Sequence, residues 1–195
     1  KKIEQIVLGS TRVFVGYNHV VSEGINKIIE LINSGIIGEV ITIDVEFREN
    51  WKGIFNAHPW LSGPEDSYLG FSEKGGGASG EHSHALNLWQ YLSSVCGSKK
   101  IVEVQAMLDY SNEKIVDYDR SCLLNLKTDT GLVGRVIQDV VTSPSKKNAL
   151  IQGSKGKIEW LCHYKNNDDR IIVYDESSNF KTFDFKKNRP DDFVV

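Results

Sequence analysis

Isoleucines recur at helical spacing near the start of the chain. They are Ile25, Ile28, Ile29 and Ile32. A spacing of three or four residues places such side chains on one face of a helix. Gly35 follows them, where a glycine commonly ends a helix. The pattern therefore predicts an amphipathic helix over residues 20–34.

A second helical pattern follows three consecutive glycines in the middle of the chain. Its apolar positions are Ala85, Leu88, Trp89 and Leu92. We expect a helix that begins after the glycines and runs to about Cys96, where Gly97 ends it. Glu81, His82 and His84 lie at its start. Backbone N–H groups at a helix start are unpaired and favour anionic neighbours, so this junction is where we expect any chemistry.

Alternation of apolar and polar residues predicts strands in most of the remaining chain. The clearest alternation covers residues 40–49, and a β-rich run at 12–17 precedes the first helix. Seven more β-rich runs, separated by short turn sequences, follow the second helix. They cover residues 101–108, 119–126, 131–141, 148–153, 157–161, 170–174 and 180–185. Successive strands joined by short turns form antiparallel meanders. We therefore expect an α+β fold, a large and mostly antiparallel sheet with helices packed on one face.

Residues 50–74 show no period and are rich in aromatic residues. A segment of this length without a period is usually functional or disordered, and its aromatic content argues against disorder. We interpret it as a loop folded over a pocket. Trp51, Trp60 and Tyr68 would shape that pocket and stack on a ligand such as a sugar ring.

Charge and cysteine content narrow the class of protein. The formal net charge of −3 gives no reason to expect nucleic acid or an anionic membrane as a partner. The basic pair Lys146-Lys147 is interpreted as a solvated turn. No apolar run approaches the roughly 20 residues that span a bilayer, and no apolar signal-peptide segment opens the chain. Three widely separated cysteines without a CxxC pattern indicate reduced thiols, so we expect a cytoplasmic protein.

The acid and the two histidines at the helix start permit more than one interpretation. A histidine beside a carboxylate can exchange a proton with a substrate hydroxyl, which makes His84 and Glu81 candidates for catalysis. Polar residues that only satisfy the helix start are the simpler alternative. A metal site that adds His58 is a third, but residues two apart do not share a helix face, so we predict no metal. The glycines lack both common phosphate-binding fingerprints.

Five segments occur together in an order and spacing that one known family shares. They are residues 15–18, 32–40, 75–77, 84–87 and 151–158. Together they resemble the C-terminal domain of the Gfo/Idh/MocA family, the nicotinamide-dependent sugar and polyol dehydrogenases. His58-Pro59-Trp60, Asp66 and Tyr68 resemble a branch associated with bacterial nucleotide-sugar and surface-sugar pathways.

The resemblance implies a two-domain enzyme. Residues 1–17 would be a remnant of the preceding dinucleotide-binding domain, and residues 18–195 a C-terminal substrate and oligomerisation domain that is truncated at its end. NAD or NADP would be bound mainly by the missing domain, which also carries a catalytic lysine in the family. The expected partners are a small sugar substrate and further copies of the chain, joined through the open sheet face. The fragment alone would be inactive.

The resemblance also implies roles for individual residues. His84 matches a catalytic or substrate-orienting histidine, and Asn87 stands where an aspartate is usual. Family members often carry an aspartate four residues before the histidine. Here that position is Gly80, so Glu81 becomes the candidate for this role. The candidates for substrate binding are Asn18, Trp51, His58, Trp60, Tyr68 and Asn87, and those for cofactor binding are Gly75, Gly76 and Gly77.

Two other functions remain open at this point. One is a non-catalytic sugar-binding or dimerisation module, which would share the fold but transfer no hydride. The other is a metal-dependent hydrolase that uses His58, His82 and His84.

Overall fold

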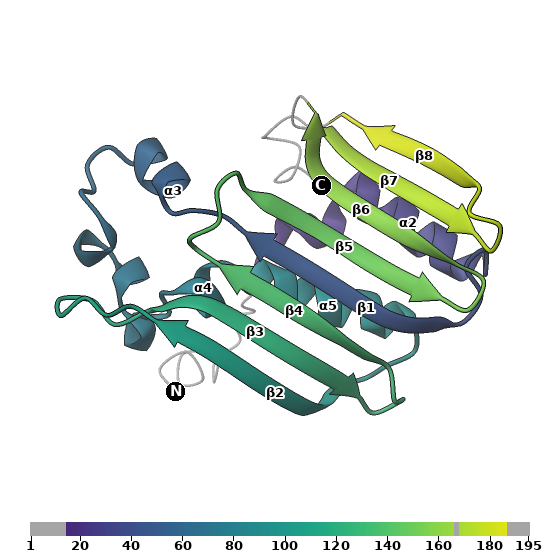
Figure 1. Ribbon diagram of the computed structural model, residues 1–195, viewed down its shortest axis with the longest axis horizontal. Helices are drawn as coiled ribbons and strands as arrows, with labels where there is room; N and C mark the ends of the chain where they lie inside the picture. The colour runs from purple at the N-terminus through teal and green to yellow at the C-terminus, as the bar shows by residue number, and fades with distance from the viewer. Residues whose placement is uncertain (1–14, 166–167, 187–195) are drawn as a thin grey trace, which may run out of the picture.

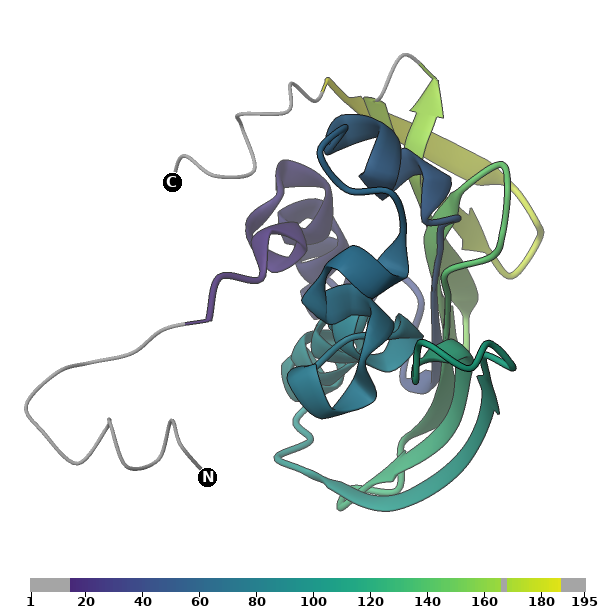
Figure 2. The same cartoon turned by 90° about the vertical axis from the view of Figure 1, so that its left-hand side faces the viewer.

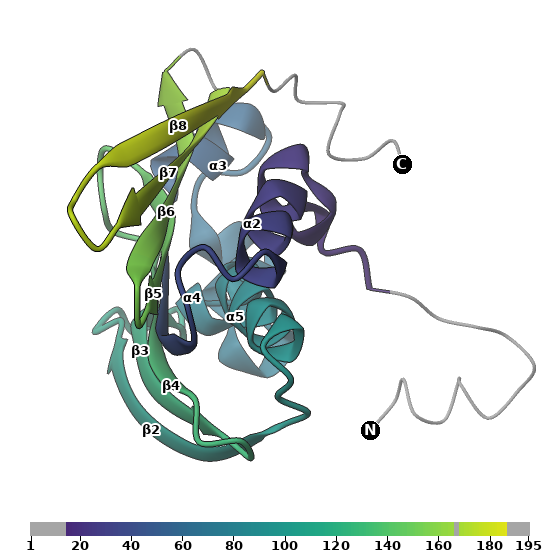
Figure 3. The same ribbon diagram turned by 90° about the vertical axis from the view of Figure 1, so that its right-hand side faces the viewer.

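A curved sheet of eight strands forms the body of the protein in the computed structural model, which describes residues 15–165 and 168–186 (Figure 1). The strand order is β2-β3-β4-β1-β5-β6-β7-β8. The strands are β1 (Val40–Arg48), β2 (Ile101–Tyr110), β3 (Asp119–Thr128), β4 (Val133–Asp139), β5 (Lys146–Gly153), β6 (Gly156–Lys165), β7 (Asp168–Asp175) and β8 (Phe180–Phe185). The helices α2, α4 and α5 lie on one face of this sheet (Figures 2 and 3). The predicted α+β fold is confirmed.

Strand β1 occupies a central position that its place in the sequence does not indicate. It lies between β4 and β5, parallel to β4 and antiparallel to β5. All other neighbouring strands are antiparallel, as expected for meanders. The two meanders β2–β4 and β5–β8 are therefore joined into one sheet by β1.

The alternating pattern of β1 explains how it fits between the meanders. Ile43, Val45 and Phe47 are fully buried under the helices. On the opposite face, Asp44 pairs with Arg135 of β4 at 2.9 Å. Because successive side chains of a strand point to opposite faces, the apolar side chains of β1 lie in the core and its acidic side chains on the open face.

The first predicted helix is confirmed, although it begins later than expected. Helix α2 covers Glu23–Asn33, and the 3-10 turn η1 covers Asn18–Val21. The boundary is set by Ser22, whose side chain accepts a hydrogen bond from the Ile25 amide at 3.3 Å. Gly35 follows the helix with a φ of 72°, a left-handed conformation that glycine adopts without strain.

The second predicted helix is divided in two. Helix α4 covers Ala78–Glu81 and helix α5 covers Ser83–Val95, with His82 in a non-helical conformation between them. All four apolar positions predicted for this helix are fully buried on α5. The predicted end is confirmed as well, since Gly97 has a φ of 87°.

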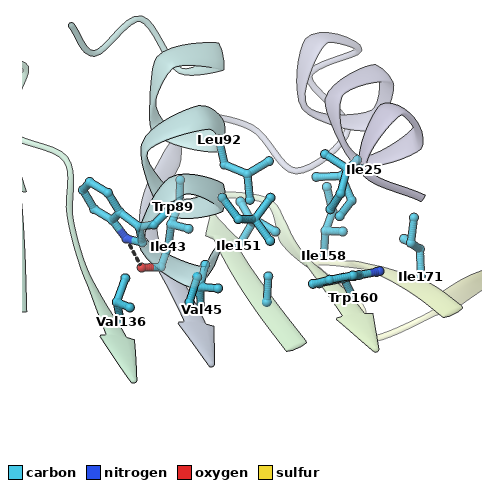
Figure 4. Packing of buried hydrophobic residues seen from close by; sticks show 14 of the residues in the cluster. Ile25, Ile43, Val45, Trp89, Leu92, Val136, Ile151, Ile158, Trp160 and Ile171 are labelled. Atoms are coloured by element: carbon cyan, nitrogen blue, oxygen red, sulfur yellow. Dashed lines mark hydrogen bonds between the residues drawn. The ribbon is translucent and has the colours of Figure 1, made fainter. Parts of the chain in front are cut away.

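Trp89 of α5 connects the helix layer to the sheet (Figure 4). Its indole nitrogen donates a hydrogen bond of 2.8 Å to the backbone carbonyl of Ile43. Gly134 lies opposite Ile43 in the β1–β4 register. A Cβ at position 134 would collide with the Ile43 carbonyl and stand 2.8 Å from the indole nitrogen, so this hydrogen bond requires glycine there.

Three details of the sequence interpretation are corrected. Residues 50–74 are not one loop. They form α3 (Lys52–Ala57) and the 3-10 turns η2 (Pro64–Asp66), η3 (Tyr68–Gly70) and η4 (Ser72–Lys74), which are too short to show a hydrophobic period. Lys146 and Lys147 begin strand β5 and are not a solvated turn. The strand predicted at 12–17 lies partly outside the described residues, and residues 15–17 are not in a strand because none of the eight strands pairs with them.

Within residues 15–165 and 168–186, no helix is long and apolar enough to cross a membrane.

Replacing Trp89 with Phe tests the link between helix and sheet. The ring stays in the core, but the buried Ile43 carbonyl loses its donor, which costs about 1–3 kcal/mol. We expect the free energy of unfolding, measured by urea denaturation, to fall by this amount. Trp60→Phe is the control, because the indole at 60 is exposed, and its effect should stay within about 0.5 kcal/mol. Equal losses in the two variants would contradict the assignment.

Candidate active site

The junction between α4 and α5 is fixed to the sheet by buried and partly buried hydrogen bonds. The Asp119 carboxylate, at the start of β3, accepts from the Ser79 amide at 2.8 Å and from the Ser79 hydroxyl at 3.0 Å. The Gln138 side chain of β4 donates to the Ala78 carbonyl at 3.1 Å. Helix α4 therefore cannot move without breaking contacts to two strands. His84 lies in the first turn of α5, directly after this fixed segment.

His84 is held by aromatic rings. Its imidazole makes perpendicular contacts with Tyr17 at 5.2 Å and with His19 at 5.3 Å between ring centroids. Its Nδ1 atom is buried and has no hydrogen-bonding partner in the described part of the chain. Burial, and then the positive charge of Lys147, lower the pKa of His84. The imidazole is therefore mostly neutral at pH 7 and able to accept a proton.

His82 is placed differently from His84. It is 4 % exposed, and its Nε2 atom has no hydrogen-bonding partner in the described part. Burial and then Lys147 lower the pKa of His82 to about 4, although Glu49 and Asp139 oppose this shift. A neutral, buried imidazole at the break between two helices serves the local structure and is not accessible to a substrate.

Lys147 is a charged residue of this site that the sequence interpretation missed. It lies opposite Phe47 in the register of β1 and β5, on the side of the sheet that faces the helices. Its side chain is 17 % exposed, and its ammonium pairs with Glu49 at 2.7 Å. Burial opposes ionisation of Glu49, but the charge and hydrogen bond of Lys147, together with His82 and His163, outweigh it and lower the pKa of this carboxyl. The sequence does not distinguish Lys146 from Lys147. Because they are consecutive residues of β5, their side chains point to opposite faces of the sheet.

Glu81 is directed toward Tyr68. The Tyr68 hydroxyl donates to the Glu81 carboxylate at 3.2 Å. Burial, and then the charge of Glu81, raise the pKa of Tyr68, so the hydroxyl stays protonated as the donor. Among the described residues no hydrogen bond joins Glu81 to His84.

The glycines at 75–77 are occupied by contacts within the protein. Their amides donate to the backbone carbonyls of Ser72, Phe71 and Leu69, each at 3.0 Å. A phosphate cradle needs free amides, so this placement gives no support to the prediction that the glycines bind a cofactor. The same turn explains Gly80, where a Cβ would collide with the Gly75 carbonyl. No side chain, an aspartate included, fits there on this backbone.

The aromatic candidates of residues 50–74 separate into a buried and an exposed group. Trp51 is buried in a small second core and packs on Tyr118 at 4.4 Å between ring centroids. Trp60 is 73 % exposed, and Tyr68 is exposed as well. His58 contacts the Trp60 ring at 5.1 Å, and its Nδ1 lies 2.7 Å from the Ile54 carbonyl. Only the exposed rings are accessible to a ligand.

The two candidate asparagines lie beside the histidines of the site. Asn18 begins η1 and precedes His19. Asn87 follows His84 on α5, one turn later, and its Oδ1 atom is buried with no hydrogen-bonding partner in the described part.

Metal binding finds no geometric basis in the described residues. Among them, no three His, Cys, Asp or Glu side chains are placed to hold a metal ion. The hydrolase alternative that uses His58, His82 and His84 therefore lacks a site there.

Comparison with known protein families identifies the family of this chain. The model of the GFO/IDH/MocA C-terminal domain matches residues 25–159. The chain belongs to the Gfo/Idh/MocA family. The resemblance inferred from the five sequence segments is thus confirmed.

Several solved structures of oxidoreductases contain a domain similar in fold to this Gfo/Idh/MocA domain. A levoglucosan dehydrogenase in complex with NADH and L-sorbose has a TM-score of 0.71 at 18 % identity, over 96 % of this chain and 50 % of that one. An inositol dehydrogenase homolog complexed with NAD+ from Azotobacter vinelandii has a TM-score of 0.69 at 16 % identity, over 99 % and 49 %. A putative oxidoreductase from Thermotoga maritima has a TM-score of 0.65 at 14 % identity, over 88 % and 48 %.

At these identities the likeness shows a shared fold. The chain spans about half the length of each of these proteins. No curated protein sequence matches the chain significantly.

Substitution of the two lysines tests the electrostatics of the site. Lys147→Met removes a positive charge beside His84, so we expect the pKa of His84 to rise towards its ordinary value. Lys146→Met is the matched control, because Lys146 lies on the open face and pairs there with Glu46 at 2.7 Å. The measurement is an NMR pH titration of the imidazole signals, with His84→Gln used to assign them. Equal shifts in the two variants, or no shift in either, would contradict this account.

Proposed function

We propose that this chain is the C-terminal half of an NAD(P)-dependent oxidoreductase that acts on a sugar or nucleotide sugar. Residues 18–195 would form the substrate and oligomerisation domain, and residues 1–17 would end the preceding dinucleotide-binding domain. Membership of the Gfo/Idh/MocA family supports this, as do similar structures described in complex with NADH or NAD+ and, in one case, L-sorbose.

The observation that carries the proposal is the imidazole of His84 in the first turn of α5, held by the rings of Tyr17 and His19. Oxidation of a sugar alcohol removes a hydride from carbon and a proton from the hydroxyl oxygen. When bound, the nicotinamide supplies the hydride chemistry. His84 would accept the hydroxyl proton, and in the reverse direction it would return the proton to the carbonyl oxygen. Its lowered pKa keeps the imidazole unprotonated at neutral pH, the state that a proton acceptor requires.

The remaining candidates would bind and orient the sugar. Trp60 and Tyr68 offer exposed rings for stacking, and Tyr68 holds the Glu81 carboxylate, which would be a second acid–base group. Trp51 would act indirectly, through its packing on Tyr118 in the second core, since it is buried. The polar side chains proposed to contact hydroxyl groups are Asn18, His58 and Asn87.

The cofactor would be held outside the described residues. The amides of Gly75–Gly77 are all engaged, so this segment provides no cradle for a pyrophosphate. The preceding domain would bind the dinucleotide and decide between NAD and NADP. This chain alone should therefore show no turnover.

Activity of the polypeptide that includes the preceding domain tests the proposal. We expect His84→Ala to lower kcat by about 10²–10⁴-fold, the usual contribution of a positioned acid–base group. The assay follows nicotinamide absorbance with a panel of sugars. Ile36→Ala is the control, because this half-exposed side chain lies in the loop after α2 and belongs to no proposed site. Full activity of His84→Ala would overturn the assignment of His84.

The same experiment separates the enzyme from a non-catalytic sugar-binding module. A binding module would retain ligand affinity in His84→Ala, measured by tryptophan fluorescence, and would show no nicotinamide turnover with any sugar in the wild type. The enzyme proposal requires turnover in the wild type and its loss in the variant.

The sheet face opposite the helices is the proposed oligomer interface. No described helix covers this face (Figure 3), and Met107, Leu123 and Val133 are exposed on it. We expect a homo-oligomer, which the double substitution Met107→Glu with Leu123→Glu should dissociate into protomers in light scattering. Ile36→Glu introduces the same charge away from this face and should leave the mass unchanged. A monomeric wild type would refute the interface.

A further inference from the structure

His19 lies between the sheet and His84. It belongs to η1 and is 8 % exposed. Its ring makes perpendicular contacts with His84 at 5.3 Å and with Phe47 of β1 at 4.9 Å. Trp160 of β6 lies at 6.1 Å, also edge to face. A single imidazole thus touches one residue of α5 and two residues of the sheet.

The carboxylates around the site are engaged elsewhere. Glu81 accepts from Tyr68, and Glu49 pairs with Lys147. A histidine that transfers protons is usually oriented by a hydrogen bond from its second nitrogen to a carboxylate or carbonyl. In the described residues the buried Nδ1 atom of His84 has no such partner. Ring contacts are then the interactions among the described residues that can set the plane of this imidazole.

Ring packing of this kind is directional. Edge-to-face aromatic pairs have a preferred geometry and contribute about 0.5–1.5 kcal/mol beyond their buried area. Of the two rings that contact His84 within the described residues, Tyr17 is only half-buried and follows the exposed residues Val15 and Gly16. His19 is buried and is itself held by Phe47 and Trp160, which are among the most buried side chains of the protein. His19 is therefore the rigid partner.

We propose that His19 is a positioning residue. Its ring, held by Phe47 of β1 and Trp160 of β6, would fix the orientation of the His84 imidazole. The inference rests on the proposed function, because the orientation of His84 matters to turnover only if His84 handles the substrate proton. The shape of the His19 ring carries the role, and its protonation does not.

Two substitutions of similar volume test this in the polypeptide that includes the preceding domain. His19→Phe keeps a planar ring, and we expect kcat to stay within about threefold. His19→Leu fills the space without a planar edge, and we expect kcat to fall about 10–100-fold with little change in KM, since displacement of a reacting group by about 1 Å costs on the order of 10²-fold. His19→Met is measured alongside, so that poor folding of one variant does not decide the result. Phe180→Leu, which breaks the Tyr174–Phe180 ring pair on β7 and β8, is the control and should change neither constant.

A second readout does not depend on activity. In the same polypeptide with 13C-labelled histidine, relaxation of the His84 ring should show added motion in His19→Leu and none in His19→Phe. Combined with His84→Ala, His19→Leu should cause no further loss of kcat, because it acts through the missing ring.

The outcomes separate the two proposals. Equal losses in His19→Phe and His19→Leu, or no loss in either, would overturn the role of the ring. If His84→Ala retains full turnover, the proton-transfer role proposed for His84 fails, and the relaxation data alone then decide whether His19 fixes His84.

Discussion

The hydrogen bond from Trp89 to the Ile43 carbonyl is the constraint on which the site depends. It joins α5 to β1 in the fully buried core, and it exists because Gly134 leaves room for the indole. Since His84 lies on the same helix, less than two turns before Trp89, this bond also fixes the distance between His84 and the sheet. The packing of the core and the position of the helix that carries His84 thus share one contact.

Two kinds of side chain then complete the site from the sheet. Phe47 supports His19, and Lys147, its neighbour across β1 and β5, supplies a positive charge beside the histidines. Both come from the helix-facing side of the sheet at the same end. A neutral imidazole at the helix start is the joint result of burial, ring packing and a nearby ammonium.

Much of the fold could be predicted from local patterns. The isoleucine spacing and Gly35 identified α2, and the alternation from Val40 identified β1, because periods of 3.6 and 2 are properties of the segments themselves. The position of β1 between β4 and β5 could not be predicted, since it depends on pairing between segments far apart in the chain. For the same reason the sequence could not predict that Lys146 and Lys147 lie on opposite faces of the sheet, or that His19 contacts His84. His84 could be proposed as a site residue because it stands beside glycines and a helix start, which are local signals, and because it matches a histidine of the family.

The central place of β1 has a consequence for the order of folding. Each meander can form from neighbouring strands, with short connections and little loss of chain entropy. Strand β1 is synthesised long before β4 and β5, so each of its edges stays unpaired until the strand that covers it has been made. During that interval its apolar face, with Ile43, Val45 and Phe47, depends on α2 and α5 for cover. A strand with two open edges and an apolar face is a template for pairing with another chain, so the order of synthesis exposes β1 to aggregation before the sheet is complete.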